Sequence, residues 1–416
     1  MSYSILSLDG GGTWALVQVM ILQDRFGEHA QGHDILRNFD MAIANSGGSI
    51  VLAGLCLDMR LSEIRRLFED VNVLQEIFTR VIPGSSLTGR FSAKEKKVAL
   101  KKYLIASNTT ALEAESFVSM IPSAIGKPIR IIITGFDYSR SRAVYFRSDR
   151  NSPMESGEIM NKVSGGTYTA SHYEEISLLD AVHVSSNAPV EFFDKPAKYN
   201  TVSNGKVFSK LGWDGAIGGN NNPVFSGVLE ALAYGIAADD IRVVSIGTAN
   251  TVLPVSYGMS HEPSTTFPWL VTEAGVEGNR SDIRKLATAI ISDPPDAATF
   301  NTFHLLRRPY VQNDSAFIRI NPLVKPILDI NANTWKMPGN GWRAADMKRF
   351  FEMDMAVRSS VKVGWIARFT KDFIEGYAEN QGVRLGGKGL SPILGHRTYA
   401  EAIADWRSWS DQLADR

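Results

Sequence analysis

Short apolar segments recur through the first 250 residues, and each has the length of a buried strand. Between them, apolar residues return at spacings of three and four, as at Leu61, Ile64 and Leu67, which predicts amphipathic helices. Strands that alternate with helices favour a mostly parallel sheet covered by helices on both faces. The pattern therefore predicts a three-layer α/β fold. The strand-like segments are Ser4–Leu8, Phe39–Ala44, Ile129–Thr134 and Ile241–Ile246.

Two polar stretches interrupt this alternation, and the strand pattern fades after Gly247. Ser148–Tyr173 is rich in Ser, Gly and Asn, and Lys195–Lys206 is similarly polar, so both are predicted to be surface loops or lid-like excursions. Later in the chain, Ala344–Tyr377 carries a long helical periodicity. The sequence thus predicts an α/β domain over residues 1–250. A mostly helical C-terminal part over residues 251–416 would pack on it, with a lid or regulatory role as an option.

Charge and cysteine content narrow the cellular setting. Lys and Arg together number 44, and Asp and Glu together also number 44, so the chain has no net charge that would favour nucleic acid. Any lipid contact would therefore use a local patch. The single cysteine, Cys56, excludes an intrachain disulfide and fits a reducing cytoplasm. The N-terminus lacks the basic region of a signal peptide, and no window holds the ~18 apolar residues needed to span a bilayer. We expect a cytoplasmic protein, either soluble or peripheral at a membrane.

The first segment that suggests chemistry is DGGGT at residues 9–13, which follows a strand and precedes a helix. Consecutive glycines let the backbone come close to a bound group and point N–H donors at it. The N-terminus of the following helix adds a potential that favours negative charge. The segment predicts an anion cradle, with a simple tight turn as the alternative.

A serine between a strand and a helix is the second candidate. The run ANSGG occupies residues 44–48, just after a predicted strand and before the apolar helical run at 50–57. A nucleophilic serine on such a sharp turn needs small neighbours, and this run supplies them around Ser46. Ser49 is a poorer candidate, because two β-branched residues follow it. The alternative is an ordinary turn in which a serine caps the helix.

The third segment is WDGA at residues 213–216, followed by GNNNP at 219–223. An aspartate at the end of a strand can accept a proton from a hydroxyl, and the small residues after it leave room for another loop. Asp214 is therefore a candidate base. Asp-Gly is also common in turns with no catalytic role, which is the alternative here.

The order of these three segments resembles that of the patatin-like phospholipases. Two further stretches are similar to that family: AVHVSSNAP at residues 181–189 and SIGT at 245–248. The resemblance spans roughly residues 4–250 in collinear order. It implies a patatin-like three-layer α/β sandwich with a catalytic domain over residues 1–250. It also implies a lipid acyl hydrolase of the phospholipase A type, a carboxylic ester hydrolase acting on phospholipids or other acyl lipids.

The family's site residues carry over onto positions of this chain. The resemblance implies Ser46 as nucleophile and Asp214 as its base, a dyad that needs no histidine. The seven histidines show no catalytic spacing, and His183, inside a matched stretch, is expected in the core or on a helix surface. The oxyanion-hole amides fall on Gly10, Gly11, Gly12 and Gly47, with supporting positions at Asp9, Trp14, Gly48 and Gly215.

The chain departs from the family's pattern at two positions. Trp14 stands where an arginine usually follows the glycine loop, and Ala44 stands where the serine turn usually begins with glycine. We expect Trp14 to order the loop by packing instead of by charge. The alternative function is a catalytically attenuated patatin-fold scaffold. A sugar-kinase-like or actin-like ATPase would also explain the glycine loop, but it leaves Ser46 and Asp214 without a role.

We expect no cofactor and no metal ion, because the Asp, Glu and His residues lack the spacing of a zinc site. The expected partners are the lipid substrate and, through peripheral contact, a membrane surface. Nucleic acid is not expected. The resemblance is also compatible with a homo-oligomer and with activation by a small molecule.

Overall fold

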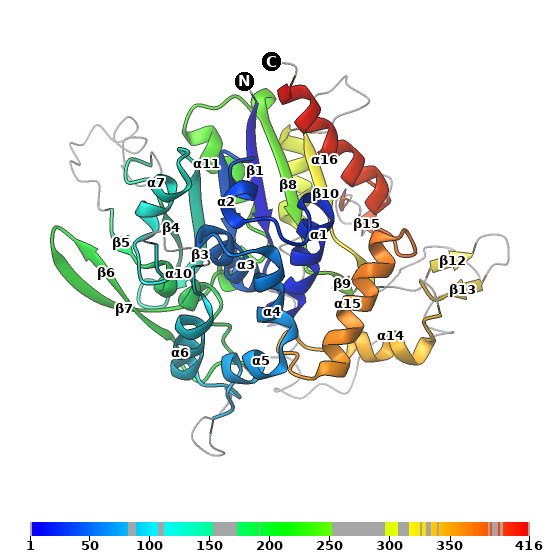
Figure 1. Ribbon diagram of the computed structural model, residues 1–416, viewed down its shortest axis with the longest axis horizontal. Coiled ribbons are helices and arrows are strands. Elements are labelled where there is room, and N and C mark those ends of the chain that lie inside the picture. Colours follow the sequence, from blue (N-terminus) through cyan, green and yellow to red (C-terminus); the bar gives the residue numbers. More distant parts are fainter. Residues whose placement is uncertain are drawn as a thin grey trace.

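A nine-stranded sheet forms the centre of the computed structural model, in the order β10-β8-β1-β2-β3-β7-β6-β5, with β4 also paired to β3 (Figure 1). The structure describes residues 2–81, 89–106, 112–152, 173–190, 192–251, 296–306, 316–324, 327–329, 334–338, 341–381, 383–384, 390–391 and 394–414. Most of the predicted loop at Ser148–Tyr173 lies outside these residues.

The sheet has a parallel half and an antiparallel half that meet at β3 (Arg130–Asp137). The parallel half contains the four segments predicted to be buried strands, so the expected α/β fold is confirmed. Its other strands are β1 (Tyr3–Leu8), β2 (Met41–Ala44), β8 (Ile241–Ile246) and β10 (Phe317–Ile320). The antiparallel half adds β4 (Arg142–Arg147), β5 (Glu175–Ile176), β6 (Ala197–Ser203) and β7 (Lys206–Asp214).

Side chains of the parallel strands alternate between two hydrophobic cores, one on each face of the sheet. Along β1, Leu6 and Leu8 enter the larger core, while Ile5 enters the smaller one. The larger core is covered by α1 (Leu16–Phe26), α3 (Ser46–Cys56), α4 (Leu61–Glu69), α10 (Leu178–Ser185), α15 (Ser360–Ile374) and α16 (Tyr399–Ala414). The smaller core is covered by α11 (Val224–Ala233) and by a helix at 296–306. The molecule is thus a three-layer sandwich.

Shorter elements connect these layers. The helices are α2 (Gly32–Leu36), α5 (Val71–Ile77), α6 (Ala93–Tyr103), α7 (Ile121–Ile125) and α14 (Ala344–Phe351), with 3-10 turns η1 (Gly12–Ala15), η2 (Val118–Met120), η3 (Gly215–Gly218) and η4 (Ala238–Asp240). The small strands are β9 (Asn250–Thr251), β11 (Leu323–Val324), β12 (Ile327–Asp329), β13 (Thr334–Lys336), β14 (Val383–Arg384) and β15 (Leu390–Ser391). Within the described ranges, no helix is both long and apolar enough to cross a bilayer.

The prediction of a loop at Lys195–Lys206 was wrong. Most of this stretch is β6, which forms a long hairpin with β7 that projects from one side of the molecule (Figure 1). Buried Tyr199 and Thr201 alternate with exposed Lys198 and Asn200. The polar residues therefore belong to the solvent face of an antiparallel strand, which needs only one apolar face.

The region after residue 250 contributes a strand as well as helices. β10 runs parallel to β8, with Phe317 opposite Val243 and Ile320 opposite Ile246. The helical periodicity predicted at Ala344–Tyr377 is confirmed by α14 and α15. The division near residue 250 stays a prediction, and the later part of the chain supplies an outer strand of the same central sheet.

Candidate functional site

Two strand ends bring the predicted nucleophile and base together. β4 pairs with β3 along residues 132–137, so β2 and β7 must share the opposite edge of β3. β2 ends at Ala44, opposite Ile133, and β7 arrives from the other direction to end at Asp214, opposite Gly135. The residues that follow β2 therefore meet the end of β7, although they are about 170 positions apart in the chain.

Ser46 begins α3 on a sharp turn. Its backbone φ is +48°, in the left-handed region that a serine seldom adopts, and its side chain is 5% exposed. Strained backbone of this kind persists only where the surroundings hold it. Here the Ser46 amide donates a hydrogen bond to the Ser185 Oγ at 2.9 Å, and the Ser46 carbonyl accepts one from the Ser49 Oγ at 2.6 Å.

Asp214 is almost fully buried beside this turn. Its Oδ1 accepts hydrogen bonds from the Asn45 Nδ2 and from the Ala216 amide, both at 2.9 Å. Burial raises the pKa of Asp214 above its usual value; the hydrogen bond with the Ser46 side chain is the largest effect in the opposite direction, followed by those from Ala216 and Asn45. The aspartate is thus a stronger base than a solvated carboxylate and lies within reach of the serine hydroxyl.

The glycine loop after β1 lies against the same turn. The Gly10 amide donates to the Asn221 carbonyl at 2.7 Å, and the Gly10 carbonyl accepts from the Thr248 Oγ1 at 2.7 Å. The first of these bonds occupies the Gly10 donor. The amides of Gly11 and Gly12, by contrast, have no acceptor among the described residues.

The glycines allow this close packing. Gly12 has a φ of +57°, and a Cβ there would lie 2.3 Å from the Met355 carbonyl oxygen. A Cβ on Gly47 would lie 2.5 Å from the Gly12 carbonyl oxygen, so the loop and the first turn of α3 are in direct contact. A Cβ on Gly48 would come similarly close to the Asp9 carbonyl oxygen, and a Cβ on Gly215 would come similarly close to the Asn45 side chain. Larger residues at these positions would separate the loop from the serine.

Comparison with known families agrees with this arrangement. The model of the patatin-like phospholipase family matches residues 6–228, which include the glycine loop, Ser46 and Asp214. The chain belongs to this family. Among solved structures, VipD from Legionella pneumophila is similar at 10% sequence identity, with 89% of this chain and 67% of that chain covered and a TM-score of 0.34. That likeness is too low to carry an argument about function. A comparison with curated proteins gives no match.

In this protein, the glycine loop is held by the C-terminal part of the chain. The Thr13 amide donates to the Met355 carbonyl and the Thr13 Oγ1 donates to the Val357 carbonyl, both at 2.9 Å. Trp14 is 7% exposed, and its ring centroid lies 5.8 Å from that of Phe350 on α14. Trp14, which occupies the position of the family's usual arginine, therefore packs against Phe350 as an apolar anchor for the loop.

A buried cation also lies beside the loop, but it comes from β10. Arg319 donates to both oxygens of Asp9, at 3.0 and 2.6 Å, and to the Ser245 Oγ at 2.7 Å. Burial raises the pKa of Asp9, and the Arg319 guanidinium partly opposes that shift. Sequence reasoning missed Arg319. The available signal was an arginine inside the four-residue strand FIRI, where a charge is tolerated only with a partner.

Ser46 opens onto an apolar pocket between the glycine loop, α3–α6 and the turn after α10. Among the described residues that line it, Lys96 is the only one with a formal charge. The apolar lining consists of Ile50, Leu67, Phe68, Leu74, Ile77, Phe78, Ala188, Phe192, Phe193 and Met355. A pocket of this composition at the serine suits a hydrocarbon chain.

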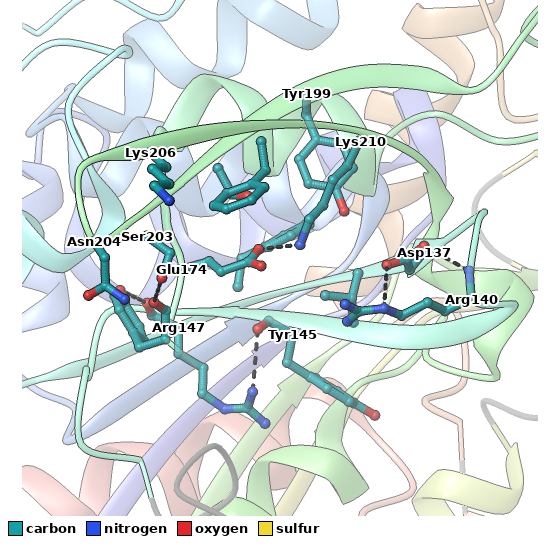
Figure 2. A pocket seen from close by; sticks show the side chains of 15 residues that line it. Asp137, Arg140, Tyr145, Arg147, Glu174, Tyr199, Ser203, Asn204, Lys206 and Lys210 are labelled. Atoms are coloured by element: carbon teal, nitrogen blue, oxygen red, sulfur yellow. Dashed lines mark hydrogen bonds and ion pairs between the residues drawn. The ribbon is translucent and has the colours of Figure 1, made fainter. Parts of the chain in front are cut away.

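A second, larger cavity of about 590 Å³ lies between β4 and the β6–β7 hairpin (Figure 2). Four of its charged residues form two pairs: Arg140 lies 3.9 Å from Asp137, and Lys210 pairs with Glu174 (Figure 2). None of the predicted site residues lines it. Of those residues, Gly12, Ser46 and Gly47 line the apolar pocket instead. His183, on α10, is buried at 2% exposure, as a core role requires.

Proposed function

We propose that this protein hydrolyses fatty-acyl esters of phospholipids or related lipids, with Ser46 as the nucleophile and Asp214 as the base. One observation carries the proposal. Ser46 sits on a strained turn at the start of α3, lies close enough to the buried Asp214 to lower the pKa of that carboxyl group, and faces an apolar pocket. Membership of the patatin-like phospholipase family supports lipid hydrolysis as the class of reaction.

In the proposed first step, the Ser46 Oγ attacks the ester carbonyl carbon while its proton moves to an Asp214 oxygen. The tetrahedral intermediate then collapses, the bond to the leaving alcohol breaks, and the proton passes from Asp214 to that alcohol. A water molecule releases the acyl group from Ser46 in a second step of the same kind. Because burial raises the pKa of Asp214, the carboxylate accepts a proton more readily than a solvated aspartate does.

The negative oxygen of the intermediate needs hydrogen-bond donors. We assign this role to the amides of Gly11 and Gly12, whose donors are unoccupied among the described residues, and to Gly47 in the first turn of α3. The Gly10 amide holds the loop to Asn221 in this arrangement. Losing one such donor typically costs about 2.7–4 kcal/mol of transition-state stabilisation, so the loop should matter nearly as much as the dyad.

The test is ester hydrolysis by Ser46→Ala and Asp214→Asn, with a short-chain nitrophenyl ester and a phospholipid in mixed micelles as substrates. Each variant should lose about 10³-fold or more in turnover while its far-UV circular dichroism stays that of the wild type. The double variant should lose no more than the worse single variant, because the two residues act as one unit.

Ser123→Ala is the control, since Ser123 is an exposed serine on α7 that does not line the pocket at Ser46. It should keep labelling by a serine-directed fluorophosphonate probe, which Ser46→Ala should abolish. Labelling of Ser46→Ala, or a catalytically silent wild type, would instead favour the attenuated scaffold.

A further inference from the structure

Lys96 is a charged side chain with no access to solvent. It projects from α6 into the apolar pocket that contains Ser46, and its exposed fraction is 0%. A lysine is almost never fully buried without partners. Its Nζ donates to the His183 carbonyl at 2.8 Å and to the Ser186 Oγ at 3.2 Å. The neighbouring Lys97, in contrast, is partly exposed and pairs with Asp180.

The turn that ends α10 joins Lys96 to both proposed reacting groups. Its Ser185 Oγ accepts from the Ser46 amide, and its Asn187 carbonyl accepts from the Asp214 amide at 3.1 Å. The residue between these two, Ser186, is the one that accepts from Lys96. One short segment thus fixes the nucleophile, the base and the lysine relative to one another.

The surroundings of the Lys96 Nζ suit a positive charge. Its carbonyl partner lies in the last turn of α10, where the helix dipole is negative. The Nζ also lies 4.3 Å from the centroid of the Phe193 ring, in the geometry of a cation–π contact. Burial lowers the pKa of Lys96 well below its usual value, and the charge of Asp214 partly opposes that shift. The helix dipole and the aromatic ring favour the charged form as well.

From this geometry we infer that Lys96 is a positioning residue, the counter-charge that keeps Asp214 ionised inside the apolar site. The inference rests on the proposed function of Ser46 and Asp214. A buried carboxylate without a cation favours its protonated form, in which it cannot take the serine proton. The charge of Lys96 opposes that protonation of Asp214, and the ammonium remains after the proton has moved to Asp214. Lys96 itself gains and loses no proton in the reaction.

Other titratable groups face this part of the molecule. His183 on α10 is held neutral, because burial and the charges of Lys96 and Lys97 lower its pKa. On α5, Glu76 pairs with Lys102 at the exposed end of α6. After α10, the Asp194 carboxylate accepts from the Ala93 amide at 2.9 Å. Removing Lys96 would raise the pKa of His183 too, so the experiment must separate the two groups.

The experiment is the pH profile of kcat/KM for ester hydrolysis by the full chain. Lys96→Met should move the acid limb to higher pH by up to about 1 unit, the low end of the effect of an opposite charge near a carboxyl group, because Lys96 is the smallest of the influences that lower the pKa of Asp214. Below the limb, kcat/KM should fall about tenfold for each unit of displacement. Lys96→Gln keeps a donor for the His183 carbonyl without the charge, so it should show the same displacement and decides the matter if Lys96→Met does not fold.

Three controls isolate the charge. Lys96→Arg should keep the wild-type limb, and so should Lys97→Met, which removes the adjacent lysine. Lys96→Gln/His183→Gln should show the displacement of Lys96→Gln alone, because His183 is not its source. An acid limb unchanged in Lys96→Gln would overturn the inference, as would a loss at every pH as complete as that of Asp214→Asn. In either case hydrolysis by the wild type still stands, whereas an inactive wild type would refute the proposed function itself.

Discussion

Arg319→Met should destabilise this protein more than loss of an ordinary surface ion pair would. Arg319 and Asp9 are 4% and 6% exposed at their side chains, and the closest N···O distance between them is 2.6 Å. Removing one partner of such a pair leaves the other buried and uncompensated, which typically costs about 3–5 kcal/mol. Arg37 and Asp34 are also 2.6 Å apart but more than half exposed, so Arg37→Met should cost about 0–1 kcal/mol.

The loss of unfolding free energy in Arg319→Met should depend on pH in a defined direction. Burial raises the pKa of Asp9 above its ordinary value, and without Arg319 that pKa rises further. A group whose pKa is higher in the folded than in the unfolded state favours folding below the unfolded value, near 3.9, and loses that contribution as pH rises through the folded value. The difference between wild type and Arg319→Met should therefore be larger at pH 7.5 than at pH 5.

Urea unfolding followed by tryptophan fluorescence at both pH values measures this difference. Asp9→Asn/Arg319→Met removes both charges and should recover most of the lost stability. A loss below about 1 kcal/mol for Arg319→Met at pH 7.5, or no recovery in the double variant, would contradict the role assigned to the pair.

Three further predictions concern the loop and its chemistry. Trp14→Ala should cost about 3–5 kcal/mol in unfolding free energy by removing the contact with Phe350, and it should lower turnover more than it raises KM; full turnover would mean that the hydrogen bonds of Thr13 suffice. Thr13→Val should leave the Val357 carbonyl unpaired, cost about 1–3 kcal/mol and slow turnover, whereas Thr13→Ser should behave as wild type. EDTA should leave ester hydrolysis unchanged, and a loss that added metal reverses would point to a metal-dependent hydrolase.

The parallel core of the fold could be predicted because its strands are buried on both faces. Such strands appear as continuous apolar runs, as in Ile241–Ile246, and the boundaries agree to within three residues. β6 was missed because its solvent-facing positions are polar. β10 was missed because Arg319 interrupts a four-residue strand. Its charge is compensated by Asp9, and no local pattern reveals a partner 310 positions away.

The proposed site could be predicted only in part. Ser46 and the glycine loop are contiguous motifs, so the sequence alone could suggest them as candidates, and the resemblance supplied Asp214. Lys96 was missed because it occurs in the run AKEKKVALKK, where lysines normally belong to a solvated helix face. Met355 was missed as well, because it contacts Gly12 through its backbone carbonyl, a group that every residue possesses.

The ion pair between Asp9 and Arg319 also bears on how the protein is made. Asp9 leaves the ribosome 310 residues before its partner, an interval of about 15–60 s at 5–20 residues per second. During that time the carboxylate has no cation to accompany it into the core, and β8 has an open edge where β10 will pair. The glycine loop consequently reaches its final place only once β10 has been synthesised. A nascent chain that already carries Ser46 and Asp214 therefore lacks the ordered glycine loop until β10 has emerged.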